Sequence, residues 1–374
     1  MTSRADPPAD AGVAAPRRIG GEFELAAADF ACTANDLAGP PGLGAPHEAW
    51  LDTGRSALAL IARDLARQSP RALVWLPAYA CESVFAPFLR AGLAVRPYAT
   101  GEDLQGLPHP RDGDAVLFIH YFGRRHDAAI SATPEWRARG VRVIEDCVQA
   151  PFTAGAGQHG DHAITSLRKV LAVPDGALLA SRRPLDATAL PPDEAFIASR
   201  TAAKWLRGPG GNSSAFLPLV AESEARLDNA APRTMSWTAS HLLRRLDVQA
   251  VARQRRHNHA VLAEGLATLV DAGALRPLLG ALRDGEVPLG LPVVVAGDRR
   301  DALRRYLAGQ EIFCPVHWDL PQLPVDGFDL ERQLSARMLT LPLDQRYDDH
   351  DMHRLLDALR HFFIPSATFP GARP

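Results

Sequence analysis

Lysine is almost absent from this chain of 374 residues. Only two of its 41 basic residues are lysines, Lys169 and Lys204, and the others are arginines. Arginine stays protonated and does not act readily as an amine nucleophile, whereas burial or a nearby charge activates lysine. Where arginine has replaced lysine nearly everywhere, a remaining lysine is a candidate for chemistry that arginine cannot perform.

Other absences exclude whole classes of protein. Cys32, Cys81, Cys147 and Cys314 form no CxxC pair, which argues against a zinc ribbon or a disulfide framework. The 13 histidines show no HExxH or comparable spacing, so no metal is expected. A net charge of −2 predicts no nucleic-acid partner. Without a membrane-length apolar run or a charged-then-apolar leader, we expect no membrane contact and a cytoplasmic location.

The chain divides by composition into three parts. Residues 1–16 are rich in Ala, Pro and Asp and predict a flexible tail. Residues 17–235 predict a large domain of α/β class, because short apolar runs alternate with helical or loop segments, as in a mostly parallel sheet covered on both faces. Residues 236–374 predict a long helix and a smaller α+β domain. The strand-like runs are 73–76, 95–98, 115–122, 141–145 and 163–167.

Two motifs suit an anionic cofactor that carries a ring. Gly54-Arg55-Ser56 opens a predicted helix, whose free backbone N–H groups suit a phosphate, although many helices begin this way for capping alone. Asp146 ends an apolar run with Gln149 three residues later, so the carboxylate could hold a protonated ring nitrogen. A helix cap with a solvated acidic pair is the structural alternative.

Lys169 carries the third motif. It stands three residues after Ser166, beyond a predicted strand and before a Pro/Gly turn. An amine there could bond covalently to a carbonyl while Ser166 binds an anion; a surface lysine on a turn is the alternative. A phosphate site, an aspartate and a lysine in this order meet the requirements of pyridoxal phosphate. Lys204 lacks such a setting, and Arg255 is expected on a solvated helix face.

These motifs resemble the DegT-type sugar aminotransferases, a group of fold type I enzymes that use pyridoxal phosphate. The similarity extends from about residue 19 to the final helix. The resemblance implies an aspartate aminotransferase-like large domain with a mostly parallel sheet and a smaller C-terminal α+β domain. The segments that carry it are IGGEFEL, TGRSALALI, VWLPAYACESVFAPFLRAG, FIHYFGRRHD, VRVIEDCVQA, TSLRKVLAVPDGALLAS and LTLPLDQRY.

The resemblance implies a role for each matching residue. Lys169 would bond to the cofactor and move protons, and Asp146 would pair with the pyridine nitrogen. Gln149 would lie beside the ring. Gly54, Arg55, Ser56 and Ser166 would hold the phosphate, and either Tyr79 or Cys81 would lie over the ring. His317, Tyr121, Asn229 and Arg233 are the substrate candidates, the last two reaching a neighbouring subunit's site in a homodimer with shared active sites.

The function implied is an aminotransferase. An amino acid, glutamate being expected, would donate the amino group to a ketone on a nucleotide-linked or modified sugar. The alternatives are another pyridoxal-phosphate reaction, elimination or condensation in a natural-product pathway, and a regulator that binds the cofactor without turnover.

Overall fold

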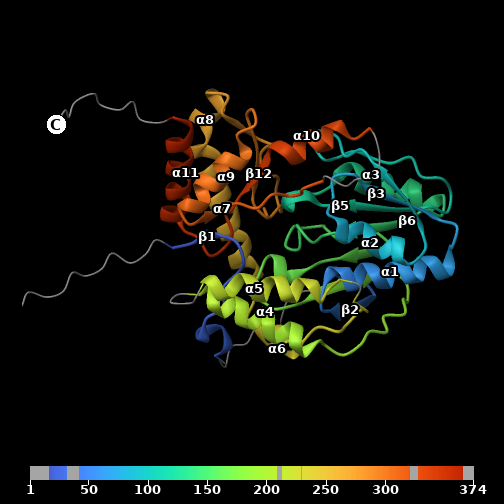
Figure 1. The fold of residues 1–374 in the computed structure, drawn as a ribbon. Helices are drawn as coiled ribbons and strands as arrows, with labels where there is room; N and C mark the ends of the chain where they lie inside the picture. The colour runs from blue at the N-terminus through green and yellow to red at the C-terminus, as the bar shows by residue number, and fades with distance from the viewer. Residues whose placement is uncertain (1–16, 32–41, 209–212, 229, 321–326, 365–374) are drawn as a thin grey trace, which may run out of the picture.

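The computed structural model describes residues 17–31, 42–208, 213–228, 230–320 and 327–364. The tail predicted over residues 1–16 lies outside this part of the chain. Figure 1 shows two groups of elements, with the C-terminal helices and strands, orange to red, beside a larger sheet. The blue strand β1 (Ile19–Gly20) lies with the C-terminal group.

The larger sheet has seven strands in the order β2-β8-β7-β6-β5-β3-β4, and only β8 runs against the others. The mostly parallel sheet predicted from the sequence is therefore confirmed. The apolar run over residues 115–122 is strand only to Ile119, where a 3₁₀ turn follows. The strands are β2 (His47–Leu51), β3 (Leu73–Pro77), β4 (Ala94–Tyr98), β5 (Ala115–Ile119), β6 (Arg142–Asp146), β7 (His162–Ile164) and β8 (Ala177–Ser181).

Both faces of this sheet are covered. Because side chains alternate along a strand, Val116, Phe118 and Val143 face α3 (Asp127–Ala138), while Leu117 and Ile144 pack in the core that includes α1 (Gly54–Gln68) and α2 (Glu82–Arg90). Coverage on two sides explains why these strands read as continuous apolar runs rather than as alternating ones.

The C-terminal group has its own core. An antiparallel sheet in the order β12-β10-β9 packs with the helices around it, and Ile19 of β1, paired with β11, belongs to the same core. The predicted boundary at residue 236 stays a prediction. The elements are β9 (Leu275–Pro277), β10 (Leu291–Val295), β11 (Ile312–Phe313), β12 (Met338–Leu341), α9 (Arg300–Gly309), α10 (Asp329–Arg337) and α11 (Asp349–Phe363).

The long helix predicted after residue 236 is in fact three helices: α6 (Trp237–Leu243), α7 (Val248–Gly265) and α8 (Ala267–Asp271). Asp247 accepts a hydrogen bond from Ala250 N and so starts a new helix within the helical pattern. The other elements are α4 (Glu194–Arg207), α5 (Ser213–Ala225) and three 3₁₀ turns, η1 (Ala27–Phe30), η2 (Tyr121–Gly123) and η3 (Leu167–Lys169).

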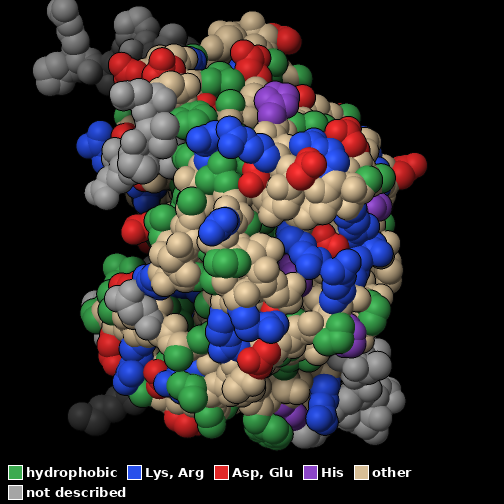
Figure 2. All heavy atoms as spheres, turned by 90° about the vertical axis from the view of Figure 1, so that its right-hand side faces the viewer, with side chains coloured by type: hydrophobic (Ala, Val, Ile, Leu, Met, Phe, Trp, Pro, Cys, Tyr) green, Lys and Arg blue, Asp and Glu red, His purple; other side chains and the backbone are tan. Residues whose placement is uncertain are grey.

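The surface in Figure 2 carries basic side chains in separate clusters with acidic ones among them. Cys81, Cys147 and Cys314 are free thiols. Within the described ranges, no helix combines the length and the apolar character needed to cross a bilayer.

Candidate active site

The candidate residues gather at one edge of the large sheet. Asp146 is the last residue of β6, Ser166 follows β7 by two residues, and Gly54 begins α1 three residues after β2. The carboxyl ends of parallel strands meet at this edge, which is where open α/β sheets bind ligands.

A cavity of about 340 Å³, here called the Asp146 cavity, brings most of the predicted cofactor residues together. Its lining includes Gly54, Arg55, Cys81, Asp146, Gln149, Ser166 and Lys169, and also Glu22, Thr53, Ser83, Arg168, Glu224 and Trp318. Residues more than a hundred positions apart in the sequence therefore share one small space.

Asp146 and Lys169 face this space with unused polar atoms. Asp146 is 5% exposed, its Oδ1 accepts from Val148 N at 2.9 Å, and its Oδ2 has no partner among the described residues. Burial raises the pKa of Asp146, although the Val148 hydrogen bond and the charge of Lys169 oppose that shift. The Lys169 side chain is exposed, and no hydrogen bond within the described chain holds its amine.

Gln149 is held by one end of its amide. Its Oε1 accepts from Phe122 N at 2.7 Å, so its Nε2 remains a donor in the cavity that Asp146 also lines.

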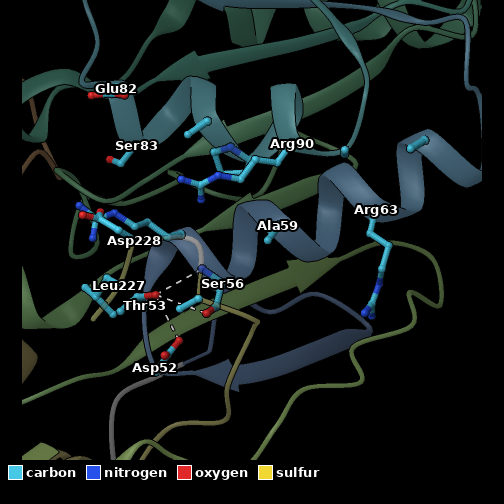
Figure 3. Close-up of a pocket in the computed structure, with 16 residues that line it drawn as sticks. Asp52, Thr53, Ser56, Ala59, Arg63, Glu82, Ser83, Arg90, Leu227 and Asp228 are labelled. Carbon is cyan, nitrogen blue, oxygen red and sulfur yellow. Dashed lines mark hydrogen bonds between the residues drawn. The ribbon is translucent and has the colours of Figure 1, made fainter. Parts of the chain in front are cut away.

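The start of α1 offers backbone donors. Thr53 caps the helix, because its Oγ1 accepts from Ser56 N at 3.3 Å (Figure 3). The N–H groups of Gly54 and Arg55 precede the first intrahelical hydrogen bond and are free for a ligand. Ser56 lines a neighbouring groove of about 640 Å³ between α1 and α2 rather than the Asp146 cavity.

A network of ion pairs forms one wall of the Asp146 cavity. Glu224 of α5 lies 2.8 Å from Arg168, 3.4 Å from Arg55 and 3.5 Å from Arg200. Burial alone would raise the pKa of Glu224, but these three arginines outweigh it and lower the value. The Glu224 carboxylate thus lies between Arg55 and Arg168, the two arginines that line the cavity, at a place that suits an anion.

Glu22 extends the network to the second lysine. It lies 2.9 Å from Arg200 and 3.0 Å from Lys204, both of which are almost fully buried. Burial favours a raised pKa for Glu22, but Lys204 and Arg200 hold it at about 2. The network joins four cations to two carboxylates and so has two positive charges in excess. Arg168, whose side chain is only 10% exposed, also has a buried Nε atom without a hydrogen-bond partner in the described part of the chain.

Of the two residues predicted to lie over the ring, Tyr79 and Cys81, the structure brings only one to the Asp146 cavity. Cys81 lines the Asp146 cavity, but Tyr79 does not; its hydroxyl donates to His317 O, and its ring packs 5.6 Å from that of Trp318. Trp318 is the aromatic residue among those that line this cavity. Tyr121 is buried behind them and donates to Tyr79 O.

A larger cavity of about 1060 Å³, here called the His317 cavity, also contains Lys169 in its wall. His317 bonds through Nδ1 to Thr340 Oγ1 at 2.9 Å, and burial, with the charge of Lys169, lowers its pKa to about 4. His317 is therefore neutral at pH 7. This cavity has a basic wall formed by Arg18, Arg207, Arg304 and Arg305, with Phe216 and Phe313 beside it.

Four of the predicted residues line neither of these cavities: Ser56, Tyr79, Tyr121 and Arg233. Asn229 lies outside the described residues. The guanidinium of Arg233 donates to Pro191 O at 2.7 Å, and Arg233 is not among the residues that line either cavity. Sequence reasoning missed Glu22, Glu224 and Arg200, because single charged residues on helices or in a bend carry no motif.

One buried group superficially suggests a metal. The ligand atoms of His120, Glu145 and Cys147 lie within 4.8 Å of one another. However, His120 Nδ1 accepts from His126 N, its Nε2 bonds to Glu145, and Glu145 also accepts from backbone amides that include Gly157 N. The His120 and Glu145 atoms therefore already have partners, and the pair ties the ends of β5 and β6 to the loop after β6.

The chain was compared with protein-family models, curated proteins and solved structures. No protein-family model and no curated protein matches the chain. The solved structures similar to it include DesV of S. venezuelae in complex with a ketimine intermediate (20% identity, 96% of this chain and 92% of that one, TM-score 0.60), DesI in the presence of its TDP-sugar product (18%, 85% and 81%, 0.58), and NtdA of Bacillus subtilis with bound cofactor PMP (14%, 85% and 74%, 0.61).

The chain has the fold of the DegT-type sugar aminotransferases. The fold type I architecture expected from the sequence is thereby confirmed.

Proposed function

We propose that this protein is a pyridoxal-phosphate-dependent aminotransferase that transfers an amino group from an amino acid to a ketone on a nucleotide-linked or modified sugar. One observation carries the proposal: Lys169, Asp146, Arg55 and Arg168 line one cavity. The ion-pair network of which its wall is a part has two positive charges in excess, supplied by the buried Arg200 and Lys204 behind that wall. NtdA, which shares the fold, holds PMP, and DesI was solved with a TDP-sugar product.

The residues present fit pyridoxal phosphate. A phosphate monoester carries a charge of about −1.5 to −2 at pH 7, which balances the excess of the ion-pair network. The charges of Arg55 and Arg168, the Ser166 hydroxyl and the N–H groups of Gly54 and Arg55 would hold that phosphate. The free Asp146 Oδ2 would accept from the ring N–H, and Gln149 Nε2 would donate to the ring oxygen.

The bound cofactor would supply an electron sink for the carbon from which a proton is removed. Lys169 performs the chain's part of that chemistry, because its amine lies between the Asp146 and His317 cavities and can move a proton between substrate and cofactor carbons. Asp146 would face the ring nitrogen and accept a hydrogen bond from it. The basic wall of the His317 cavity suits the anionic part of a nucleotide-linked sugar.

The test is the visible absorption of the purified protein before and after glutamate is added, with Lys169→Ala beside it. A coloured species that glutamate bleaches, with formation of the keto acid, and that the variant lacks, supports the proposal. Colour without keto acid points to elimination, condensation or a regulator without turnover. No colour after addition of pyridoxal phosphate refutes the proposal.

A homodimer and a cytoplasmic location belong to the same proposal. The groove between α1 and α2 adjoins the Asp146 cavity at Thr53, Arg55 and Ser83, so a partner chain seated there would reach the site. Light scattering should then give twice the chain mass of 40.4 kDa. A monomer that forms the coloured species would refute sharing of sites.

A further inference from the structure

Arg255, near the middle of α7, is a buried cation without a carboxylate among its hydrogen-bond partners. It is 2% exposed. Its Nε donates to Gln345 Oε1 at 2.8 Å, one Nη donates to the carbonyls of Pro288 and Leu289 at 3.1 Å, and the other donates to Val170 O at 3.3 Å. Burial lowers the pKa of Arg255 to about 10, which still leaves it charged at pH 7.

The Val170 carbonyl receives a second donor. Gln345 Nε2, from the loop after β12, donates to the same oxygen at 3.0 Å. Val170 directly follows Lys169, and its own N–H donates to Leu167 O at 3.0 Å, which closes the η3 turn. The peptide beside the reactive amine is therefore held both within its turn and by two side chains from the C-terminal part of the chain.

A guanidinium is suited to this task. Its donors are fixed in one plane and reach three carbonyls and an amide oxygen at once, which an ammonium or a thioether cannot do. A buried carbonyl that loses its donors costs free energy, which a shift of the backbone relieves. Loss of Arg255 would thus be relieved by movement of the turn that carries Lys169.

We propose that Arg255, with Gln345, is a positioning residue that sets the Lys169 amine at the distance needed to bond to the cofactor aldehyde. The inference rests on the proposed function. In that reaction the Lys169 amine adds to the aldehyde carbon and one water molecule leaves, so its yield depends on where the amine stands. The binding of a cofactor that cannot bond to Lys169 does not depend on the position of that amine.

The test compares two ligands on the apoprotein. Pyridoxal phosphate is titrated by the absorption of its covalent adduct, and pyridoxamine phosphate, which has an amine in place of the aldehyde, by calorimetry. Arg255→Met should weaken pyridoxal phosphate by about tenfold and leave pyridoxamine phosphate within about twofold. Arg255→Lys should fall between this variant and the wild type. Arg253→Met, on the exposed face of the same helix, should change neither affinity.

Each other outcome is decisive. Equal weakening of both ligands by Arg255→Met would show a merely structural role, and unchanged affinities would show no role; either overturns the inference. If Arg255→Met does not fold, Gln345→Leu, which removes one of the two donors to Val170, decides by the same comparison. A wild-type protein that forms no adduct, or a Lys169→Ala variant that forms one, refutes the proposed function instead.

Discussion

Replacing Glu224 by glutamine removes the negative charge that Arg55 and Arg168 now share. If these arginines hold a phosphate, the carboxylate competes with it. The Glu224 side chain is 36% exposed, so solvent screens each pair to about 0.2–1 kcal/mol. The Arg168 side chain is 10% exposed and its pair is 2.8 Å long, which places that pair at the upper end of the range.

Phosphate must displace two of these pairs, at a total of about 1–2 kcal/mol, which corresponds to about fivefold to thirtyfold in affinity. Calorimetry with inorganic phosphate and apoprotein at low ionic strength should show tighter binding to Glu224→Gln by that factor. Folding should lose about 1–2 kcal/mol, the sum of the same two pairs, while Arg200 keeps its pair with Glu22 at 2.9 Å.

Glu222→Gln is the matched control, since Glu222 is exposed on the same helix and forms no ion pair within the described chain. Equal phosphate affinity in the wild type and both variants would refute the idea that the Glu224 carboxylate competes with phosphate for Arg55 and Arg168. Weaker binding by Glu224→Gln would mean instead that the carboxylate holds the arginines in place for the ligand.

Two further predictions follow from the site, and a third from Asp175, a buried carboxyl just before β8 that accepts hydrogen bonds from Ser236 N at 2.8 Å and Ser236 Oγ at 2.6 Å. Asp146→Asn keeps the shape but removes the charge, so turnover should fall by about 10²–10³ while adduct absorption persists, and unchanged turnover would contradict the assigned role. Trp318→Ala should weaken pyridoxal and pyridoxamine phosphate alike by about twofold to tenfold, whereas the exposed Trp237→Ala should not. Burial raises the pKa of Asp175 from 3.8 to about 6, so its stabilising contribution, roughly 3 kcal/mol, is complete below pH 4 and lost as the pH rises through 6. Denaturation curves of Asp175→Asn should lack this slope; parallel curves for both proteins would disprove it.

The sequence anticipated the features that depend on local pattern. The apolar runs at 73–76 and 141–145 became β3 and β6, and the Gly54 motif begins α1. The long helical pattern after residue 236 could not show its two breaks, because one N-cap aspartate among helix-forming residues has little weight against continuous periodicity.

Arg255 shows why part of the site escaped prediction. In the sequence it follows another arginine by two residues on a polar helix, so a solvated face is expected. The fold instead buries it, because Gln345, Val170, Pro288 and Leu289 arrive from other segments and satisfy its donors. Burial of a charge depends on partners supplied by distant chain, and a local pattern does not contain them.

The sequence by itself determined the chemical groups: one lysine after a serine, one aspartate at the end of a strand, and a helix start suited to an anion. Tertiary structure alone decided that Lys169 and Asp146 share a cavity, that Glu224 lies between two arginines, and that the peptide after Lys169 is held from α7. Periodicity and capping act over a few residues and are legible in the chain, whereas cavities and ion-pair networks arise only when segments more than a hundred residues apart pack together.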